Sequence, residues 1–198
     1  MTLNHRQAGL RERKKAKTMA SIQMHALRLF RELGYKATTV EQIAEAAEIS
    51  YSTFFRYFSS KEDVLIIDNY DPLLISSFES QPAELSPLQA LRNAMLSGVK
   101  EMTPGELATM RERNELVMSV PELRAAMLNN MLSMMDLIID MTCKRTGRQR
   151  EDIAVRTFAG AVTGVNISVM LHYAEHAEAD FSILLGEALS KLEEGLTL

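Results

Sequence analysis

Apolar residues in this chain recur at three- and four-residue spacing, and that spacing limits the fold to packed helices. The clearest stripe runs from Met19 to Leu33, and Gly34 follows it where a left-handed helix end is expected. No segment of useful length alternates apolar and polar residues as a strand would. Gly and Pro number only 9 and 5 in 198 residues, which favours long helices. The sequence therefore predicts an all-α protein.

Three short helical patterns follow Gly34 with very short connections. Each begins at a pattern that fits a helix N-terminal cap: Thr38 with Glu41, Ser50, and Ser59 with Glu62. The first two short helices, over about 40–47 and 51–57, are joined by a tight turn behind the longer helix. This arrangement predicts a helix-turn-helix, with a fourth helix opening near Ser59.

The remainder of the chain is expected to form a second helical domain. The polar stretch from Glu79 to Pro87 is the best linker candidate, and Ser86-Pro87 suits a helix start. Pro and Gly positions favour further helices over 87–102, 104–119, 121–146, 150–174 and 179–194. The expected architecture is a three-helix domain over 1–62, a larger helical domain over 63–198, and about nine helices in all.

Charge separates the two parts. Residues 1–61 carry 11 Lys and Arg against 5 Glu, whereas the remainder carries 11 basic against 21 acidic residues. A basic head on an acidic body favours contact between the head and a polyanion, and a solvated basic tail is the alternative.

Other features of the composition bear on where the chain works. The single Cys143 excludes an internal disulfide and fits a reducing cytoplasm. The sequence contains no run of about 18 apolar residues, so it predicts no membrane span. The basic N-terminus lacks the apolar segment of a secretory signal. We therefore expect a cytoplasmic protein without a membrane partner.

The runs ATTVEQIAEAA (37–47), IS (49–50) and TFFRYFSSKEDVL (53–65) resemble the DNA-binding segment of TetR-family transcriptional regulators. The end of the preceding helix, with Ala26, Leu29, Phe30, Leu33, Gly34 and Tyr35, also matches that family in register. The resemblance covers about 15–65 and implies a DNA-binding head, a ligand-binding body and a homodimer on a pseudo-palindromic operator. Two positions depart from the family pattern, namely Ser52, where Gly is frequent, and Phe55, where Tyr is frequent.

The candidate DNA contacts lie at the starts and on the outward side of the short helices. They are Thr39, Tyr51, Ser52, Thr53, Arg56, Tyr57 and Lys61. Thr39 and the first amides of its helix suit a phosphate, because a helix N-terminus is electropositive. The resemblance adds Tyr57 and Lys61 as phosphate contacts. Tyr51, Ser52 and Arg56 are the candidates for reading base edges.

A basic segment precedes these helices. Its cationic residues are Arg11, Arg13, Lys14, Lys15 and Lys17. They could follow the DNA backbone or enter the minor groove, and a disordered solubilising tail is the alternative.

The second domain offers a candidate ligand pocket and a candidate dimer interface. Methionine adapts to irregular apolar ligands, and the pocket candidates are Met95, Met102, Met110, Met118, Met131, Met135, Phe158 and Val162. Ordinary core filling is the alternative. Small residues on one stripe let helices approach closely, and the interface candidates are Gly160, Gly164, Ser168, Phe181, Leu184, Leu185, Ala188 and Leu192. Close packing within one chain is the alternative.

No pattern favours catalysis or a cofactor. His172 and His176 are four residues apart, but without a third ligand we expect a partly exposed pair rather than a metal site. Cys143 is expected to act as a small buried hydrophobe. We expect a repressor, not an enzyme, that a small lipophilic effector releases from its operator. The rival hypotheses are a helical enzyme or binding bundle with a vestigial DNA head, and a nonspecific DNA-packaging protein.

Overall fold

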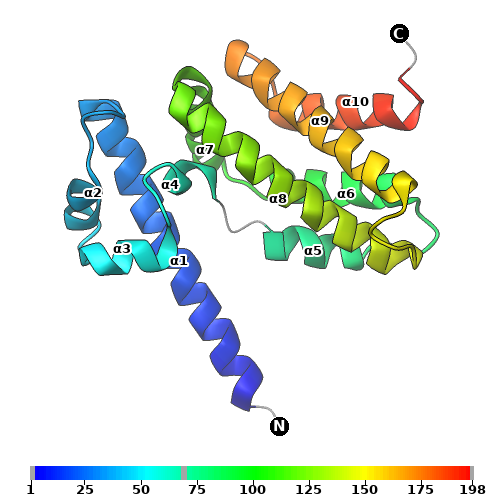
Figure 1. Ribbon diagram of the computed structural model, residues 1–198, viewed down its shortest axis with the longest axis horizontal. Coiled ribbons are helices and arrows are strands. Elements are labelled where there is room, and N and C mark those ends of the chain that lie inside the picture. The colour runs from blue at the N-terminus through cyan, green and yellow to red at the C-terminus, as the bar shows by residue number, and fades with distance from the viewer. Residues whose placement is uncertain (1–2, 68–70, 197–198) are drawn as a thin grey trace. The chain divides into compact units, whose positions relative to one another are not determined.

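The computed structural model describes residues 3–67 and 71–196, and within these ranges it contains ten helices and no strand (Figure 1). Side chains are described from Lys14 to Ile67 and from Pro72 to Leu196. The chain divides into two compact units, Met1–Asn69 and Tyr70–Leu198, where the sequence suggested a boundary between 62 and 63. The all-α expectation is confirmed, with one helix more than the nine expected.

The first unit consists of α1 (Leu3–Leu33), α2 (Val40–Ala46), α3 (Tyr51–Tyr57) and α4 (Asp63–Ile66). The short helices gather beside the C-terminal half of α1, and the N-terminal half of α1 extends away from them (Figure 1). Helices of four to seven residues are not stable alone in water, so their apolar faces must be buried by α1. Ile22, Ile43 and Phe54 are accordingly fully buried.

The N-cap of α2 lies one residue later than predicted. Thr39 accepts a hydrogen bond from the Gln42 amide, and the Gln42 side chain accepts one from the Thr39 amide. The pairing of Thr38 with Glu41 was therefore wrong, although both pairs fit the same sequence pattern. Thr38 is instead buried, and its hydroxyl lies within hydrogen-bonding distance of the Leu29 and Gly34 carbonyls.

The predicted cap at Ser59 with Glu62 was also wrong. Asp63 is the residue that accepts the amides of Ser59 and Ser60, at 3.0 and 3.1 Å, and the Asp63 amide donates to the Ser60 hydroxyl. Glu62 does not cap the helix, because its carboxylate accepts a hydrogen bond from the Tyr35 hydroxyl. By contrast, Ser50 caps α3 as predicted, by accepting the Thr53 amide at 3.1 Å.

The loop after α1 is bonded to the segment before α4. The Lys61 ammonium donates to the Tyr35 and Thr38 carbonyls at 2.9 and 3.0 Å and lies 4.1 Å from the Tyr35 ring centroid. Burial disfavours the charged form of Glu62, but hydrogen bonds from Tyr35, its own backbone and Ser60, together with Lys61, outweigh burial and lower the pKa of Glu62 below 4.5. Charged groups thus fix the geometry on both sides of α2 and α3.

The second unit contains six helices. They are α5 (Asp71–Glu79), α6 (Pro87–Lys100), α7 (Pro104–Ser119), α8 (Pro121–Thr146), α9 (Ile153–Glu175) and α10 (Phe181–Glu193). Pro at the first position and caps at Ser86 and Thr103 explain the starts of α6 and α7. Asp152 and Asp180 cap α9 and α10, which therefore begin later than predicted. Helix α5 was not predicted.

The main core of the second unit lies among α6, α8, α9 and α10. Ala90, Ile139, Val162 and Leu189 are fully buried there, and Leu185 is 1% exposed. Burial of Leu185 in the core of its own chain corrects its assignment to a dimer interface. Small residues such as Ala90 and Ala159 allow the helices to pack closely at this centre.

We predict that Tyr35→Phe lowers the free energy of unfolding of the first unit by about 1 kcal/mol at neutral pH, because Glu62 loses a hydrogen-bond donor. A carboxylate with a lowered pKa stabilises the fold above its unfolded pKa and loses that contribution as pH falls. The difference from wild type should therefore shrink below about pH 4.5. Thermal unfolding from pH 3 to 7 measures it, and a difference that stays constant with pH would contradict the role of Glu62.

Candidate nucleic-acid interface

Helices α2 and α3 are joined by a tight turn with one residue in the left-handed region. Glu48 has φ of 54°, and the following Ile49 amide donates to the Ala44 carbonyl at 2.9 Å. The turn therefore closes back onto α2 before Ser50 starts α3. The predicted helix-turn-helix is present, with α3 as its second helix.

Helix α3 has one buried face and one exposed face. Phe54 and Phe58, four residues apart, are 0% and 1% exposed, whereas Tyr51 is 51% exposed. Ser52 and Arg56 are exposed on the outward side with Tyr51. A helix with one buried face and hydrogen-bonding side chains on the other has the form that major-groove reading requires.

The hydroxyl groups at the start of α3 form a small cluster. The Ser50 hydroxyl lies 3.0 Å from that of Ser52 and 2.8 Å from that of Thr53. Thr53 is half-buried and turned toward this cluster, so it is less available to DNA than its position on the helix suggested. Ser52 remains exposed and can exchange its contact with Ser50 for a contact with a base or phosphate.

The three candidate phosphate contacts differ in how freely they can reach a ligand. Thr39 is exposed at the start of α2. Lys61 is half-buried and already donates to two backbone carbonyls, so its position also stabilises the domain. Tyr57 is half-buried, with the Arg56 guanidinium carbon 5.5 Å from its ring centroid. Arg56 is thus the exposed cation of α3.

Phe55 was noted in the sequence as a departure from the family pattern but was not among the candidate DNA contacts, and the structure places it among the exposed residues of α3. Phe55 is 42% exposed, and its ring packs edge-on to Tyr51 with centroids 4.9 Å apart. It cannot donate to a phosphate, but an aromatic ring can contact a thymine methyl group. Exposure of an aromatic residue at a position where the helical period allows it was the available signal.

The basic segment 11–17 lies within α1, whose helix begins as early as Leu3. Lys14, Lys15 and Lys17 are exposed. The side chains of Arg11 and Arg13 lie outside the described residues. The backbone is therefore helical where a disordered tail was the alternative, and contact of this segment with DNA stays a prediction.

The predicted ligand-pocket residues fall into two groups. Met95, Met135 and Phe158 pack against the main core, and Val162 is part of it. Met102, Met110, Met118 and Met131 are half-buried and lie outside that cluster, on α7, on α8 and at the C-terminal end of α6. Only the second group stands apart from the main core.

The predicted interface residues lie on α9 and α10. Gly164 and Ser168 are exposed, and a Cβ atom added at Gly160 or Gly164 would meet nothing within 4 Å. The glycines therefore do not serve close packing within this chain. Phe181, Leu184, Ala188 and Leu192 are half-buried against the core, which leaves part of each accessible.

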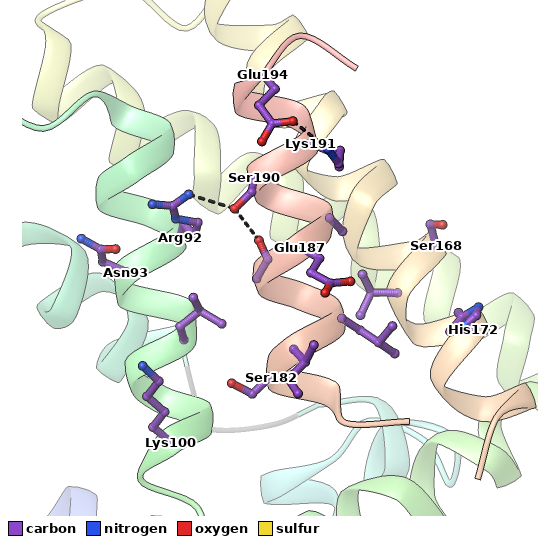
Figure 2. A pocket seen from close by; sticks show the side chains of 16 residues that line it. Arg92, Asn93, Lys100, Ser168, His172, Ser182, Glu187, Ser190, Lys191 and Glu194 are labelled. Atoms are coloured by element: carbon purple, nitrogen blue, oxygen red, sulfur yellow. Dashed lines mark hydrogen bonds and ion pairs between the residues drawn. The ribbon is translucent and has the colours of Figure 1, made fainter. Parts of the chain in front are cut away.

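An open groove of about 1090 Å³ runs along α10 between α6 and α9 (Figure 2). Arg92 of α6 donates to the Ser190 hydroxyl of α10 at 3.0 Å on one side, and Ser168 and His172 of α9 line the other side (Figure 2). Leu184 and Ala188 also line this groove, whereas none of the predicted pocket methionines does. The groove belongs to the predicted interface and not to the predicted pocket.

His172 and His176 stack with ring centroids 3.9 Å apart, and His176 Nδ1 lies 2.9 Å from the His172 carbonyl oxygen. Within the described ranges, no three His, Cys, Asp or Glu residues form a group that could hold a metal.

Helix α9 is long and apolar enough to cross a membrane by length and composition, with a mean hydropathy of 1.4. A core helix of a soluble protein meets the same criterion, and α9 also carries Thr163, Asn166 and Ser168.

Comparison with known proteins matches both units. Residues 24–66 match the model of bacterial regulatory proteins of the tetR family, and residues 85–197 match the model of the MftR C-terminal domain. The chain is 26% identical over 186 residues to the putative mycofactocin biosynthesis transcriptional regulator MftR of Mycobacterium tuberculosis, covering 93% of each. It is 44% identical over 101 residues to the regulator TcmR of Streptomyces glaucescens, covering 50% of this chain and 45% of TcmR.

The fold also matches solved structures. FadR of Thermus thermophilus, a TetR-family repressor solved with lauroyl-CoA, superimposes with a TM-score of 0.57 at 24% identity, covering 91% of this chain and 95% of FadR. The matching models span the helix-turn-helix and most of the second unit, in the order that the structure shows. The chain therefore belongs to the TetR family of DNA-binding transcriptional regulators.

Proposed function

We propose that this regulator is a homodimeric repressor that binds a pseudo-palindromic operator and leaves it when a small lipophilic effector binds the second unit. The observation that carries the DNA-binding part is the division of α3 between buried Phe54 and Phe58 and exposed Tyr51, Ser52 and Arg56. In a dimer, two such helices enter successive major grooves about one turn of DNA apart.

The exposed residues take different roles in this proposal. Arg56 can bond a guanine with two parallel hydrogen bonds, and Tyr51 and Ser52 lie beside it for further base contacts. Thr39, with the free amides of α2, binds a phosphate and so sets the position of α3. Lys61 supports the same geometry from within the domain, because its ammonium is bonded to the Tyr35 and Thr38 carbonyls.

The proposal of a dimer is supported by apolar surface of α9 and α10 that the chain itself leaves exposed. Only 28% of the apolar window of α9 is buried within the chain. Gly160 and Gly164 leave open space above the helix, and Ile183 of α10 is 60% exposed. A second copy that packs against this face would bury apolar surface and give the two-fold symmetry that a palindromic operator requires.

The effector is supported by chemistry and by a relative. Methionine side chains, half-buried at Met102, Met110, Met118 and Met131, can repack around an apolar molecule. FadR of Thermus thermophilus, a repressor of the same fold, binds lauroyl-CoA. Effector binding lowers operator affinity if the liganded body favours a spacing of the heads that the DNA does not match.

Substitution of Arg56 separates base reading from phosphate contact. On an operator selected from random duplexes by the wild type, we expect Arg56→Ala to reduce the preference over random DNA by about tenfold, because alanine has no donor for guanine. Arg56→Lys should reduce it as well, because an ammonium group lacks the planar fork of two parallel donors. Arg56→Lys keeps the charge, so binding to random DNA and its salt slope should stay as in wild type. Fluorescence anisotropy at several salt concentrations measures both, and full preference in Arg56→Ala would show that Arg56 reads no base.

Substitution of Gly164 tests the dimer face. We expect Gly164→Phe to raise the dimer dissociation constant at least about tenfold, because the ring occupies the space that a second α9 would fill. Gly98→Phe on α6 is a matched control, since Gly98 is also helical, exposed and free of contacts within 4 Å. Sedimentation equilibrium measures the dissociation constant. Equal weakening by both substitutions, or by neither, would place the dimer contact elsewhere.

A further inference from the structure

Asn114 is a polar residue in the middle of the buried face of α7. Met110 and Met118 stand one turn before it and one turn after it, on the same side of the helix, and both are half-buried. Asn114 itself is 5% exposed. A polar amide at the centre of an apolar stripe costs free energy unless each of its polar atoms has a partner.

Among the described residues, only one end of this amide has a partner. Asn114 Nδ2 donates to the Met170 carbonyl of α9 at 2.8 Å. Because that carbonyl only accepts hydrogen bonds, the nitrogen must face it, and the orientation of the amide is fixed. Oδ1 is left buried without a hydrogen-bond donor among the described residues. The site therefore presents an unused acceptor between the methionines of α7.

The neighbouring cation on this helix is not free to bind an anion. Arg111 donates to the carbonyls of Tyr173 in the last turn of α9 and of His176 and Ala179 in the connection that follows, at distances of 3.2, 3.0 and 2.5 Å. Its guanidinium carbon also lies 3.8 Å from the Tyr173 ring centroid. A carboxylate placed beside Asn114 would meet the unpaired oxygen and gain no ion pair from Arg111, so the electrostatics select a neutral donor group.

We propose that Asn114 recognises the effector, and that its Oδ1 accepts a hydrogen bond from a neutral hydroxyl or N–H group on an otherwise apolar molecule. The inference rests on the proposed effector-responsive function and specifies the ligand chemistry. Met110 and Met118 contact the apolar part of the molecule, while Asn114 fixes its donor. Through Nδ2 the same side chain donates to the Met170 carbonyl of α9, the helix that carries the proposed dimer face. A ligand held by Asn114 is therefore linked to α9 through one side chain.

Matched ligands test this assignment. Dodecanol and α-naphthol are compared with their methyl ethers, which keep the apolar part and lack the donor. Isothermal titration calorimetry on the full-length dimer gives the ratio of dissociation constants, ether over alcohol, for wild type and for Asn114→Leu. We expect the ratio for at least one pair to be about tenfold larger in wild type, which is the effect of one buried hydrogen bond. Asn129→Leu, at an exposed position on α8, is the matched control and should keep the wild-type ratio.

Several outcomes would overturn the proposal: a ratio that is the same in wild type and Asn114→Leu for both pairs, a loss that Asn129→Leu reproduces, or a wild type that binds neither alcohol. Asn114→Ala repeats the test if the leucine variant does not fold. Operator binding, followed by anisotropy in the same samples, is read separately. If the alcohols bind through Asn114 but leave operator binding unchanged, the site stands and effector-driven release fails.

Discussion

The burial of Phe54 and Phe58 is the constraint on which the DNA-binding unit depends. Helix α3 has only seven residues, and a helix of that length needs tertiary contacts to persist. The two rings supply those contacts on one face and leave Tyr51, Ser52 and Arg56 on the other. The same packing thus holds the helix and determines which of its side chains are exposed, and we propose that these exposed side chains read DNA.

A second layer of constraint comes from polar groups that fix the loops around α2 and α3. The Lys61 ammonium donates a hydrogen bond to the loop after α1, and the Glu62 carboxylate accepts one from the Tyr35 hydroxyl. The Asp63 carboxylate accepts hydrogen bonds from backbone amides just before α4. Two of these three consecutive charged residues hold the loop after α1, through the Tyr35 carbonyl and the Tyr35 hydroxyl, and the third holds the backbone before α4. A residue that the family resemblance assigns to phosphate binding, Lys61, therefore has a measurable structural role as well.

The helices were largely predictable from the sequence because their apolar periods and Pro positions are local signals. The exact caps were not, since Thr38 and Thr39 both begin a pattern that fits a capping box, and only the burial of Thr38 against α1 selects between them. Glu62 fits the sequence pattern of a capping residue, but in the structure its carboxylate accepts a hydrogen bond from the hydroxyl of Tyr35, which is distant in the sequence. Leu185 fits the pattern of the interface residues, but in the structure it faces the core of its own chain. The lack of a partner for Asn114 Oδ1 depends on contacts between α7 and α9, and no local sequence pattern reveals these contacts.

We propose that two copies of α3 read a symmetric DNA sequence. Selection of random duplexes by the wild-type protein, followed by hydroxyl-radical footprinting of the enriched sequences, tests it most directly. We expect an inverted repeat whose half-sites lie in successive major grooves on one face of the DNA, about one helical turn apart. Enrichment of no motif, with uniform protection and equal affinity for random DNA, would contradict it.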